Sequence, residues 1–176
     1  MTNPNDSRPP GVRLRAGRAW LLGDDIDTDL LAPGKWMKHP IEIVAAHCLE
    51  DVFPEFAKQV RPGDIVVAGE RFGIGSSREQ AAEALRFLGV QAVLAASYGG
   101  IFFRNALNLG LPALTFNQQA DIQDGDLITI DPATGAGFNE SRGITLQADP
   151  LPDFLIDMLK DGGLIPHLEQ RFANQH

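Results

Sequence analysis

Residues 64–116 decide the fold and read DIVVAGERFGIGSSREQAAEALRFLGVQAVLAASYGGIFFRNALNLGLPALTF. Three segments in this stretch are short, apolar and bounded by turn residues, as buried strands are: DIVVAG (64–69), VQAVLAAS (90–97) and LPALTF (111–116). Two segments between them fit helices that end at a glycine: SREQAAEALRFLG (77–89) and GGIFFRNALNLG (99–110). This alternation predicts a βαβαβ core with a parallel sheet and right-handed crossovers.

The flanking sequence predicts antiparallel additions to this core within one α/β domain. A strand is expected near the start, a short helix after Pro40, further strands joined by a Gly-containing turn, and two helices separated by a GG break. These elements correspond to residues 13–23, 41–49, 124–147 and 150–172. We expect residues 1–16 to form a disordered arm and residues 17–176 to form the domain, including its C-terminal helical segment.

Composition excludes several classes of protein. The 176 residues carry a formal net charge of −8, and the 15 Lys and Arg are scattered, which argues against a surface for nucleic acid or anionic membrane. No run approaches the roughly 18 apolar residues of a membrane span, and MTNPNDSRPPG lacks the pattern of a signal peptide. We therefore expect a cytoplasmic protein that binds neither nucleic acid nor membrane.

The residues that commonly bind metals are few or badly spaced. Cys48 is the only cysteine, so this chain alone forms no disulfide and no multi-thiolate cluster. DDIDTD (24–29) has four aspartates but lacks the spacing and closing glutamate of an EF-hand. We predict no metal site on this chain. The four histidines show no ligand pairing and are interpreted as surface or packing residues: His39, His47, His167 and His176.

FGIGSSREQ (72–80) is the candidate functional motif. It lacks the lysine of a P-loop, the flanking glycines of a nucleophile elbow and the third glycine of a dinucleotide-binding motif. Ser76 and Glu79 have the spacing of a capping box, which is a purely structural interpretation. The same geometry, with free N–H groups at a helix start and the Arg78 guanidinium, also suits a carboxylate-binding corner.

Three blocks of the sequence resemble one family. GDDIDTDLLAPGKW (23–36) looks like the N-terminal signature of the small subunits of 3-isopropylmalate dehydratase and homoaconitase. Residues 71–114 resemble their central signature, which also occurs in the C-terminal swivel domain of aconitase, and residues 150–170 resemble their C-terminal helix. The resemblance covers about residues 17–170 in order. It implies the swivelling β/β/α fold.

The resemblance also implies an activity and a partner. Members of the family are hydro-lyases that dehydrate and rehydrate a hydroxy di- or tricarboxylate, and a 4Fe–4S cluster on a large subunit binds the substrate hydroxyl. Because such a cluster takes three or four thiolates, Cys48 cannot supply it. We therefore expect this chain to bind no cofactor itself and to be active only with a large subunit, in a heterodimer of amino-acid biosynthesis such as leucine biosynthesis.

Site residues follow from the resemblance position by position. Ser76 matches the family's serine alkoxide base, and Ser77 and Arg78 match residues that hold substrate carboxylates. Helix N–H groups and a guanidinium are the positive surroundings that would offset the weak acidity of a serine. Thr28 and its neighbours match the edge of the active-site cleft.

Residues 36–39 match the loop that contacts the variable substituent of the substrate. Trp36 and Met37 would suit an apolar isopropyl group, whereas Lys38 would suit an additional carboxylate. If the Lys38 side chain is simply solvated, it has no such role.

The sequence departs from the family pattern at two single positions and in one four-residue stretch. They are Gln80 in place of a histidine, Ile74 in place of a cysteine between the glycines, and Ser97–Tyr98–Gly99–Gly100 in place of an SFAR-like stretch. The sequence is therefore also compatible with a paralogous hydratase for another alkyl malate or a homocitrate-type acid. It is compatible, too, with a non-catalytic carboxylate-sensing or scaffolding module and with a self-sufficient anion-binding enzyme.

Overall fold

The computed structural model describes residues 14–175. Residues 1–13 of the predicted N-terminal arm lie outside this range, as does His176. The described chain contains a seven-stranded sheet with the strand order β4-β3-β2-β1-β5-β6-β7.

The predicted βαβαβ core is confirmed. It runs β2-α4-β3-α5-β4, and β1 adds a fourth parallel strand next to β2. In register, Val66 of β2 pairs with Val93 of β3, and Val93 faces Ala113 of β4. The elements are β1 (Gly17–Leu21), β2 (Ile65–Ala68), α4 (Glu79–Phe87), β3 (Ala92–Ala95), α5 (Gly100–Asn108) and β4 (Ala113–Thr115). Both helices end just before a glycine, as predicted.

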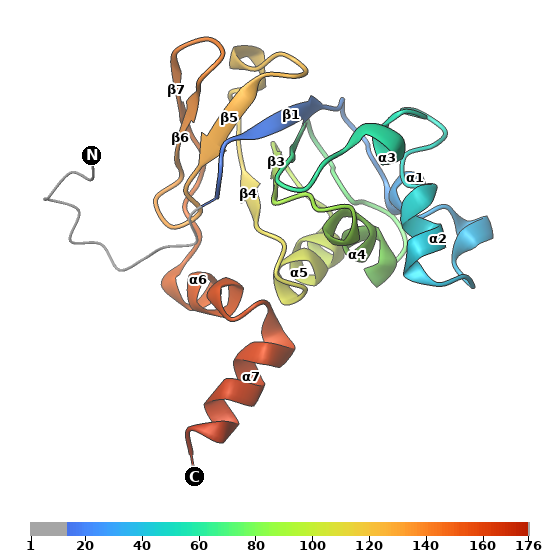
Figure 1. Ribbon diagram of the computed structural model, residues 1–176, viewed down its shortest axis with the longest axis vertical. Coiled ribbons are helices and arrows are strands. Elements are labelled where there is room, and N and C mark those ends of the chain that lie inside the picture. Colours follow the sequence, from blue (N-terminus) through green and yellow to red (C-terminus); the bar gives the residue numbers. More distant parts are fainter. Residues whose placement is uncertain (1–13, 176) are drawn as a thin grey trace, which may run out of the picture.

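The predicted antiparallel additions form the other half of the sheet (Figure 1). β5 (Leu127–Ile130) pairs antiparallel with β1, where Gly17 lies opposite Ile128. β6 (Ala136–Asn139) and β7 (Ile144–Gln147) continue the antiparallel pairing. β1 is therefore the strand at which the sheet changes from parallel to antiparallel.

Helices cover one face of the parallel strands. Each connection from β1 to β4 steps to the next strand in the same direction, so right-handed crossovers place every helix on the same side. Figure 1 shows α1 to α5 gathered there. The β1–β2 connection supplies the remaining helices of this layer: α1 (Thr28–Leu31), the short 3-10 helix η1 (Gly34–Trp36), α2 (Ile41–Ala46) and α3 (Phe56–Gln59).

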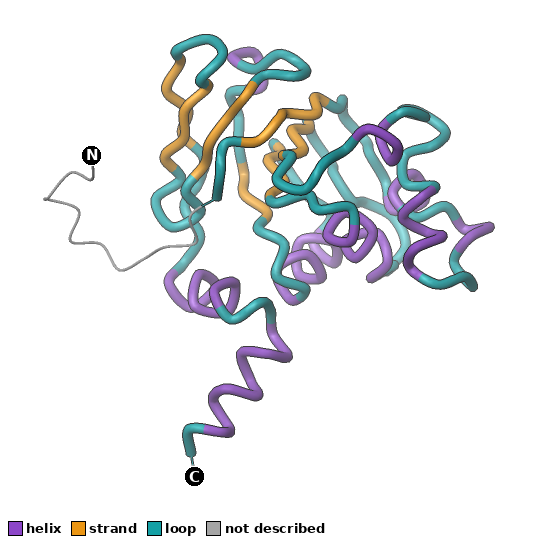
Figure 2. The backbone as a smooth tube through the Cα atoms, in the orientation of Figure 1, coloured by secondary structure: helices purple, strands orange, loops and turns teal. Residues whose placement is uncertain are grey.

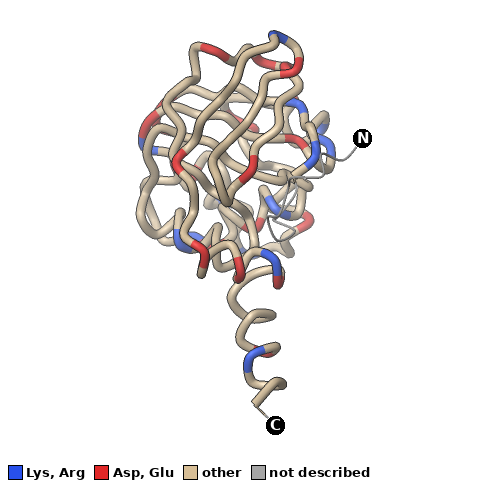
Figure 3. Tube along the Cα trace, turned by 90° about the vertical axis from the view of Figure 1, so that its left-hand side faces the viewer, with Lys and Arg blue, Asp and Glu red and all other residues tan. Residues whose placement is uncertain are grey.

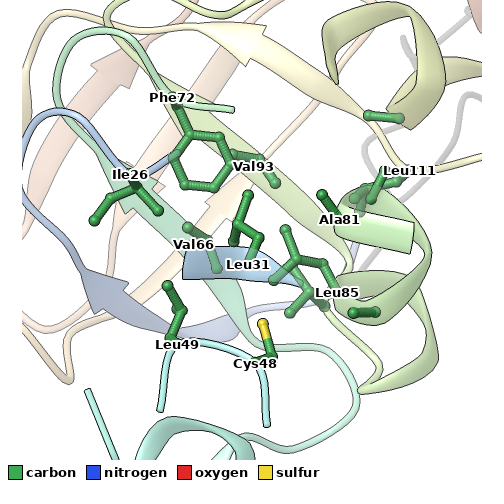
Figure 4. Close-up of a cluster of buried hydrophobic side chains, with 14 of the residues drawn as sticks. Ile26, Leu31, Cys48, Leu49, Val66, Phe72, Ala81, Leu85, Val93 and Leu111 are labelled. Atoms are coloured by element: carbon green, nitrogen blue, oxygen red, sulfur yellow. The ribbon is translucent and has the colours of Figure 1, made fainter. Parts of the chain in front are cut away.

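Alternating strand residues build a core on each face. Val66 and Val93 point toward the helices and pack with Leu31 and Leu85, as Figure 4 shows. Their neighbours in the strands point the other way, into a second cluster with side chains of the antiparallel strands and of α6 (Asp153–Lys160): Ile65, Leu94, Ile128, Leu146 and Ile156. The mixed seven-stranded sheet, with helices over its parallel strands and a second core that joins its parallel and antiparallel halves, agrees with the predicted swivel-type β/β/α fold class.

The C-terminal helices follow the predicted break at Gly162–Gly163. α6 packs on the second cluster, and α7 (Leu164–Ala173) extends away from the body of the molecule (Figure 2). None of the α7 residues is buried. The remaining 3-10 helix, η2 (Gln119–Asp121), lies in the β4–β5 connection.

Acidic and basic residues are interspersed along the described chain on the face seen in Figure 3 and do not gather there into a basic stripe. Among residues 14–175, no helix is long and apolar enough to cross a membrane.

Candidate active site

Three loops meet at the carboxyl edge of the parallel strands, where α/β proteins commonly place ligands. They follow β1, β2 and β3 and comprise residues 22–27, 69–78 and 96–99. Backbone hydrogen bonds join them: the Gly73 amide donates to the Ile26 carbonyl (2.7 Å), and the Gly99 amide donates to the Phe72 carbonyl (2.8 Å). The loop that carries both candidate serines is therefore held on either side by its neighbours.

Thr28 lies against this serine loop. The residue is 3% exposed, and its amide donates to the Ile74 carbonyl at 2.9 Å. Gly75 has a φ of 106°, and a Cβ built on it would lie 3.1 Å from Thr28 Oγ1. Only glycine adopts such a φ readily, so the loop can pass close over Thr28.

The predicted capping box between Ser76 and Glu79 is wrong. α4 begins at Glu79, its N-cap is Arg78 in an extended conformation, and no side chain of the described chain caps it. The Arg78 amide instead donates to the Ser76 carbonyl at 2.8 Å, which closes a tight turn before the helix. Because Glu79 is the first helical residue, it cannot be the third-residue partner of a capping box. Ser76 and Ser77 are exposed just ahead of the helix.

Arg78 reaches across to α1 and to the first residue after it. Its Nη1 donates to Asp29 Oδ1 at 2.6 Å and to the Ala32 carbonyl at 3.0 Å. The Gly34 amide also donates to Asp29 Oδ1, at 3.0 Å. The hydrogen bond from Arg78, and next that from Gly34, hold the pKa of Asp29 below its ordinary value. The guanidinium therefore has a defined position beside residues 29–34.

The other aspartates of DDIDTD have structural partners. Asp24 Oδ1 accepts from the Glu70 amide at 2.8 Å, and Asp27 Oδ1 accepts from the Leu30 amide at 2.8 Å as the N-cap of α1. Asp25 forms an ion pair with Arg71, and the hydrogen bond from Arg71 lowers the pKa of Asp25. The acidic loop thus ties neighbouring loops together. Within residues 14–175, no group of three or more His, Cys, Asp or Glu could hold a metal ion.

Residues 36–38 lie next to α2. Trp36 stacks on the His47 ring with centroids 3.8 Å apart, and its Nε1 donates to Glu50 Oε1 at 3.1 Å. Met37 packs against the core on the helical face, whereas Lys38 is exposed. The structure therefore brings Thr28, Ser76, Ser77 and Arg78 together where the three loops meet. It anchors the Trp36–Lys38 segment separately, through the contacts of Trp36 with His47 and Glu50.

Sequence reasoning missed two residues that hold candidate site residues in place. Asp29 holds Arg78, which lies 49 positions later in the sequence, and Glu50 holds Trp36. No local pattern identifies either partner, because both contacts join different elements.

Two of the four histidines contact carboxylates: His47 lies 2.5 Å from Glu50, and His167 lies 2.6 Å from Asp161.

The structure explains two of the residues after β3 that depart from the family pattern, Tyr98 and Gly99. A Cβ on Gly99 would lie 2.6 Å from the Gly73 carbonyl oxygen, so a side chain there would push the serine loop away. Tyr98 is largely enclosed and its hydroxyl donates to the Leu114 carbonyl at 2.7 Å, and burial raises its pKa above the ordinary tyrosine value. Nothing in the structure explains Gln80 or Ile74.

Comparison with known proteins gives consistent matches. The family model for the aconitase C-terminal domain matches residues 35–119. The chain is 50% identical over 151 residues to 3-isopropylmalate dehydratase small subunit 1 of Archaeoglobus fulgidus, covering 85% of this chain and 93% of the relative. It is 45% identical over 152 residues to the methanogen homoaconitase small subunit of Methanothermobacter thermautotrophicus, covering 86% and 88%.

A solved structure matches over nearly the whole chain. The crystal structure of 3-isopropylmalate dehydratase from Methanocaldococcus jannaschii superposes with a TM-score of 0.86 at 38% sequence identity, covering 91% of this chain and 96% of that one.

Proposed function

The chain belongs to the family of 3-isopropylmalate dehydratase and homoaconitase small subunits, and we propose that it supplies half of a hydro-lyase active site. The reaction is the dehydration and rehydration of a hydroxy di- or tricarboxylate. The observation that carries this proposal is the run Ser76–Ser77–Arg78 at the carboxyl edge of the parallel strands, in which both serines are exposed and Arg78 is partly buried.

In this proposal Ser76 is the catalytic base. As an oxyanion it removes the proton from the carbon next to a substrate carboxylate, and it returns a proton in the reverse direction. An ordinary serine hydroxyl is a very weak acid, so the oxyanion needs positive surroundings. α4 begins at Glu79, three residues after this serine, and the positive end of the helix dipole lies there. The exposed position also lets a substrate reach the hydroxyl.

Ser77 and Arg78 hold the substrate carboxylates. Asp29 and the Ala32 carbonyl both accept from Nη1 of Arg78, which anchors this end of the guanidinium, and in this proposal its remaining N–H groups face a substrate carboxylate. Thr28 supports the serine loop from beneath through its bond to Ile74. This preorganisation lowers the cost of bringing the substrate and base together.

A 4Fe–4S cluster does not fit this chain. Such clusters take three or four thiolates, and Cys48 is the only cysteine of the sequence. Cys48 is fully buried in the apolar core, where burial raises the pKa of its thiol (Figure 4). We therefore propose that a large subunit carries the cluster and that this chain acts only in the complex with it, in the cytoplasm.

Trp36, Met37 and Lys38 contact the variable substituent of the substrate in this proposal. The apolar pair suits an isopropyl group, and the exposed ammonium suits a further carboxylate. If the substituent is an isopropyl group, the pathway is leucine biosynthesis. If it carries a further carboxylate, the substrate is a homocitrate-type acid.

The test is activity of the reconstituted pair. We would co-express this chain with a large subunit that contains a three-cysteine cluster signature, reconstitute the iron–sulfur cluster without oxygen, and assay a panel of hydroxy acids. The proposal requires turnover by the pair and none by this chain alone. Turnover by this chain alone in air, or failure of the two chains to co-purify, would overturn it.

A further inference from the structure

Glu50 is the common partner of three side chains around Trp36. Its Oε1 accepts from Trp36 Nε1 at 3.1 Å and lies 3.2 Å from Lys35 Nζ, while Oε2 contacts His47 Nδ1 at 2.5 Å. These bonds, the one to His47 first, lower the pKa of Glu50 to about 2. Glu50 is therefore ionised under physiological conditions and only a quarter exposed.

The Trp36 indole is fixed in two ways at once. Its face stacks on the His47 ring with an interplanar angle of 8°, and its edge is bonded to Glu50. The Glu50 carboxylate also binds the stacked histidine, so one side chain sets the position of both rings. A rotation of Trp36 would have to break the stacking and the hydrogen bond together.

The backbone that carries Glu50 is itself unusual. Leu49 has a φ of 61° although it is a fully buried leucine, a conformation that bulky residues rarely adopt. Its amide donates to the Leu30 carbonyl at 2.8 Å, and its side chain lies in the core shown in Figure 4. These contacts hold the strained turn in place, and the turn directs Glu50 away from the core toward Trp36. Strained residues that the surroundings over-determine concentrate at functional positions.

We propose that Glu50 is a positioning residue that determines substrate choice by fixing the Trp36–Lys38 segment. This inference rests on the proposed function, because it assumes that the segment contacts the variable substituent of the substrate. Met37 and Lys38 follow Trp36 directly, so the anchored Trp36 side chain restrains the backbone that carries them. Without Glu50, the segment would sample several orientations and would favour no single substituent.

Two measurements on Glu50→Ala and Glu50→Gln test the proposal. The first is acrylamide quenching of tryptophan fluorescence in this chain, with Trp36→Phe identifying the Trp36 contribution against that of buried Trp20. We expect Trp36 to become more accessible in Glu50→Ala. Glu50→Gln should show a smaller change, because the amide oxygen can still accept from the indole.

The second measurement is specificity in the reconstituted pair. We expect the ratio of kcat/KM for 3-isopropylmalate to that for a homocitrate-type acid to shift toward unity by about tenfold in Glu50→Ala. The matched control is Glu55→Ala, since Glu55 also makes a surface ion pair, with Lys58 at 3.5 Å, and lies outside the proposed site. It should change neither quenching nor specificity.

The outcomes separate the two proposals. An unchanged ratio in Glu50→Ala, from a wild-type pair that turns over, overturns the role of Glu50 and leaves the proposed function standing. An equal fall of kcat/KM for both substrates shows a merely structural role and also overturns it. Inactivity of the wild-type pair on every hydroxy acid overturns the proposed function, and this inference with it.

Discussion

The side chains of Asp25 and Arg71 form an ion pair between two neighbouring loops. Both residues have a left-handed backbone conformation. Their φ values are 58° and 59°. Arg71 Nη2 lies 3.0 Å from Asp25 Oδ2, and Arg71 Nε engages Asp25 Oδ1 as well. Such backbone conformations persist where surrounding contacts hold them. The pair therefore fixes the loop after β1 relative to the loop that carries Ser76.

Replacement of Arg71 should separate backbone strain from the ion pair. Arg71→Ala and Arg71→Gly both remove the pair, but only glycine accepts a positive φ without strain. We expect a lower midpoint of urea unfolding for Arg71→Ala than for Arg71→Gly, and a higher KM of the assembled enzyme for both. Equal midpoints would contradict a strained backbone at Arg71.

Ser76→Ala should abolish most activity and leave stability unchanged. Loss of a general base typically costs about 10²–10⁴-fold in rate, whereas the exposed Ser76 side chain caps no helix. A capping serine would instead cost about 1 kcal/mol on replacement. Turnover of the pair and urea unfolding of this chain measure the two effects. Destabilisation with retained turnover would restore the capping interpretation and remove Ser76 from catalysis.

Arg78→Lys should impair the enzyme although the charge is kept. A lysine ammonium cannot hold Asp29 and the Ala32 carbonyl and also present a flat fork to a carboxylate. We expect kcat/KM to fall by about 10²-fold, as small misplacements at a reacting centre do. Arg86→Lys, on the far end of α4, is the matched control and should keep full activity. Unchanged kinetics in Arg78→Lys would remove this residue from the substrate site.

Gly99 and Gly100 offer a matched pair of neighbouring positions. A Cβ on Gly99 would lie 2.6 Å from the Gly73 carbonyl oxygen, whereas a Cβ on Gly100 meets nothing within 4 Å. We expect Gly99→Ala to destabilise the protein by about 1–3 kcal/mol through overpacking and to lower activity by moving the serine loop. Gly100→Ala, at the first position of α5, should be neutral or stabilising by up to about 1 kcal/mol. Urea unfolding of both variants checks the difference, and equal effects would refute it.

The sequence predicts the architecture well because the alternation of apolar strand segments and glycine-terminated helices is repeated along the chain. Three β-rich apolar segments and two glycine-terminated helices leave few arrangements other than a parallel βαβαβ core. Burial of Val66 on one face and Ile65 on the other then follows from strand geometry.

The start of α4 could not be predicted in the same way. The spacing of Ser76 and Glu79 favours a capping box, but the loop is already bound to its neighbours through Gly73 and through Ile74. These tertiary hydrogen bonds outweigh a local preference worth about 1 kcal/mol. The contacts of Arg78 with Asp29 and of Glu50 with Trp36 were equally hidden, because they form only once separate elements pack together.

The alkylation of the buried Cys48 thiol can report how often the core around it opens. A thiol reacts as the thiolate, so a fully buried thiol with a raised pKa stays inert to alkylating reagents until the core around it opens. The rate of Cys48 alkylation therefore measures how often the helical layer lifts from the sheet. Docking of a large subunit on the folded chain would suppress that opening and slow the alkylation, which gives a binding assay that needs no substrate and no turnover.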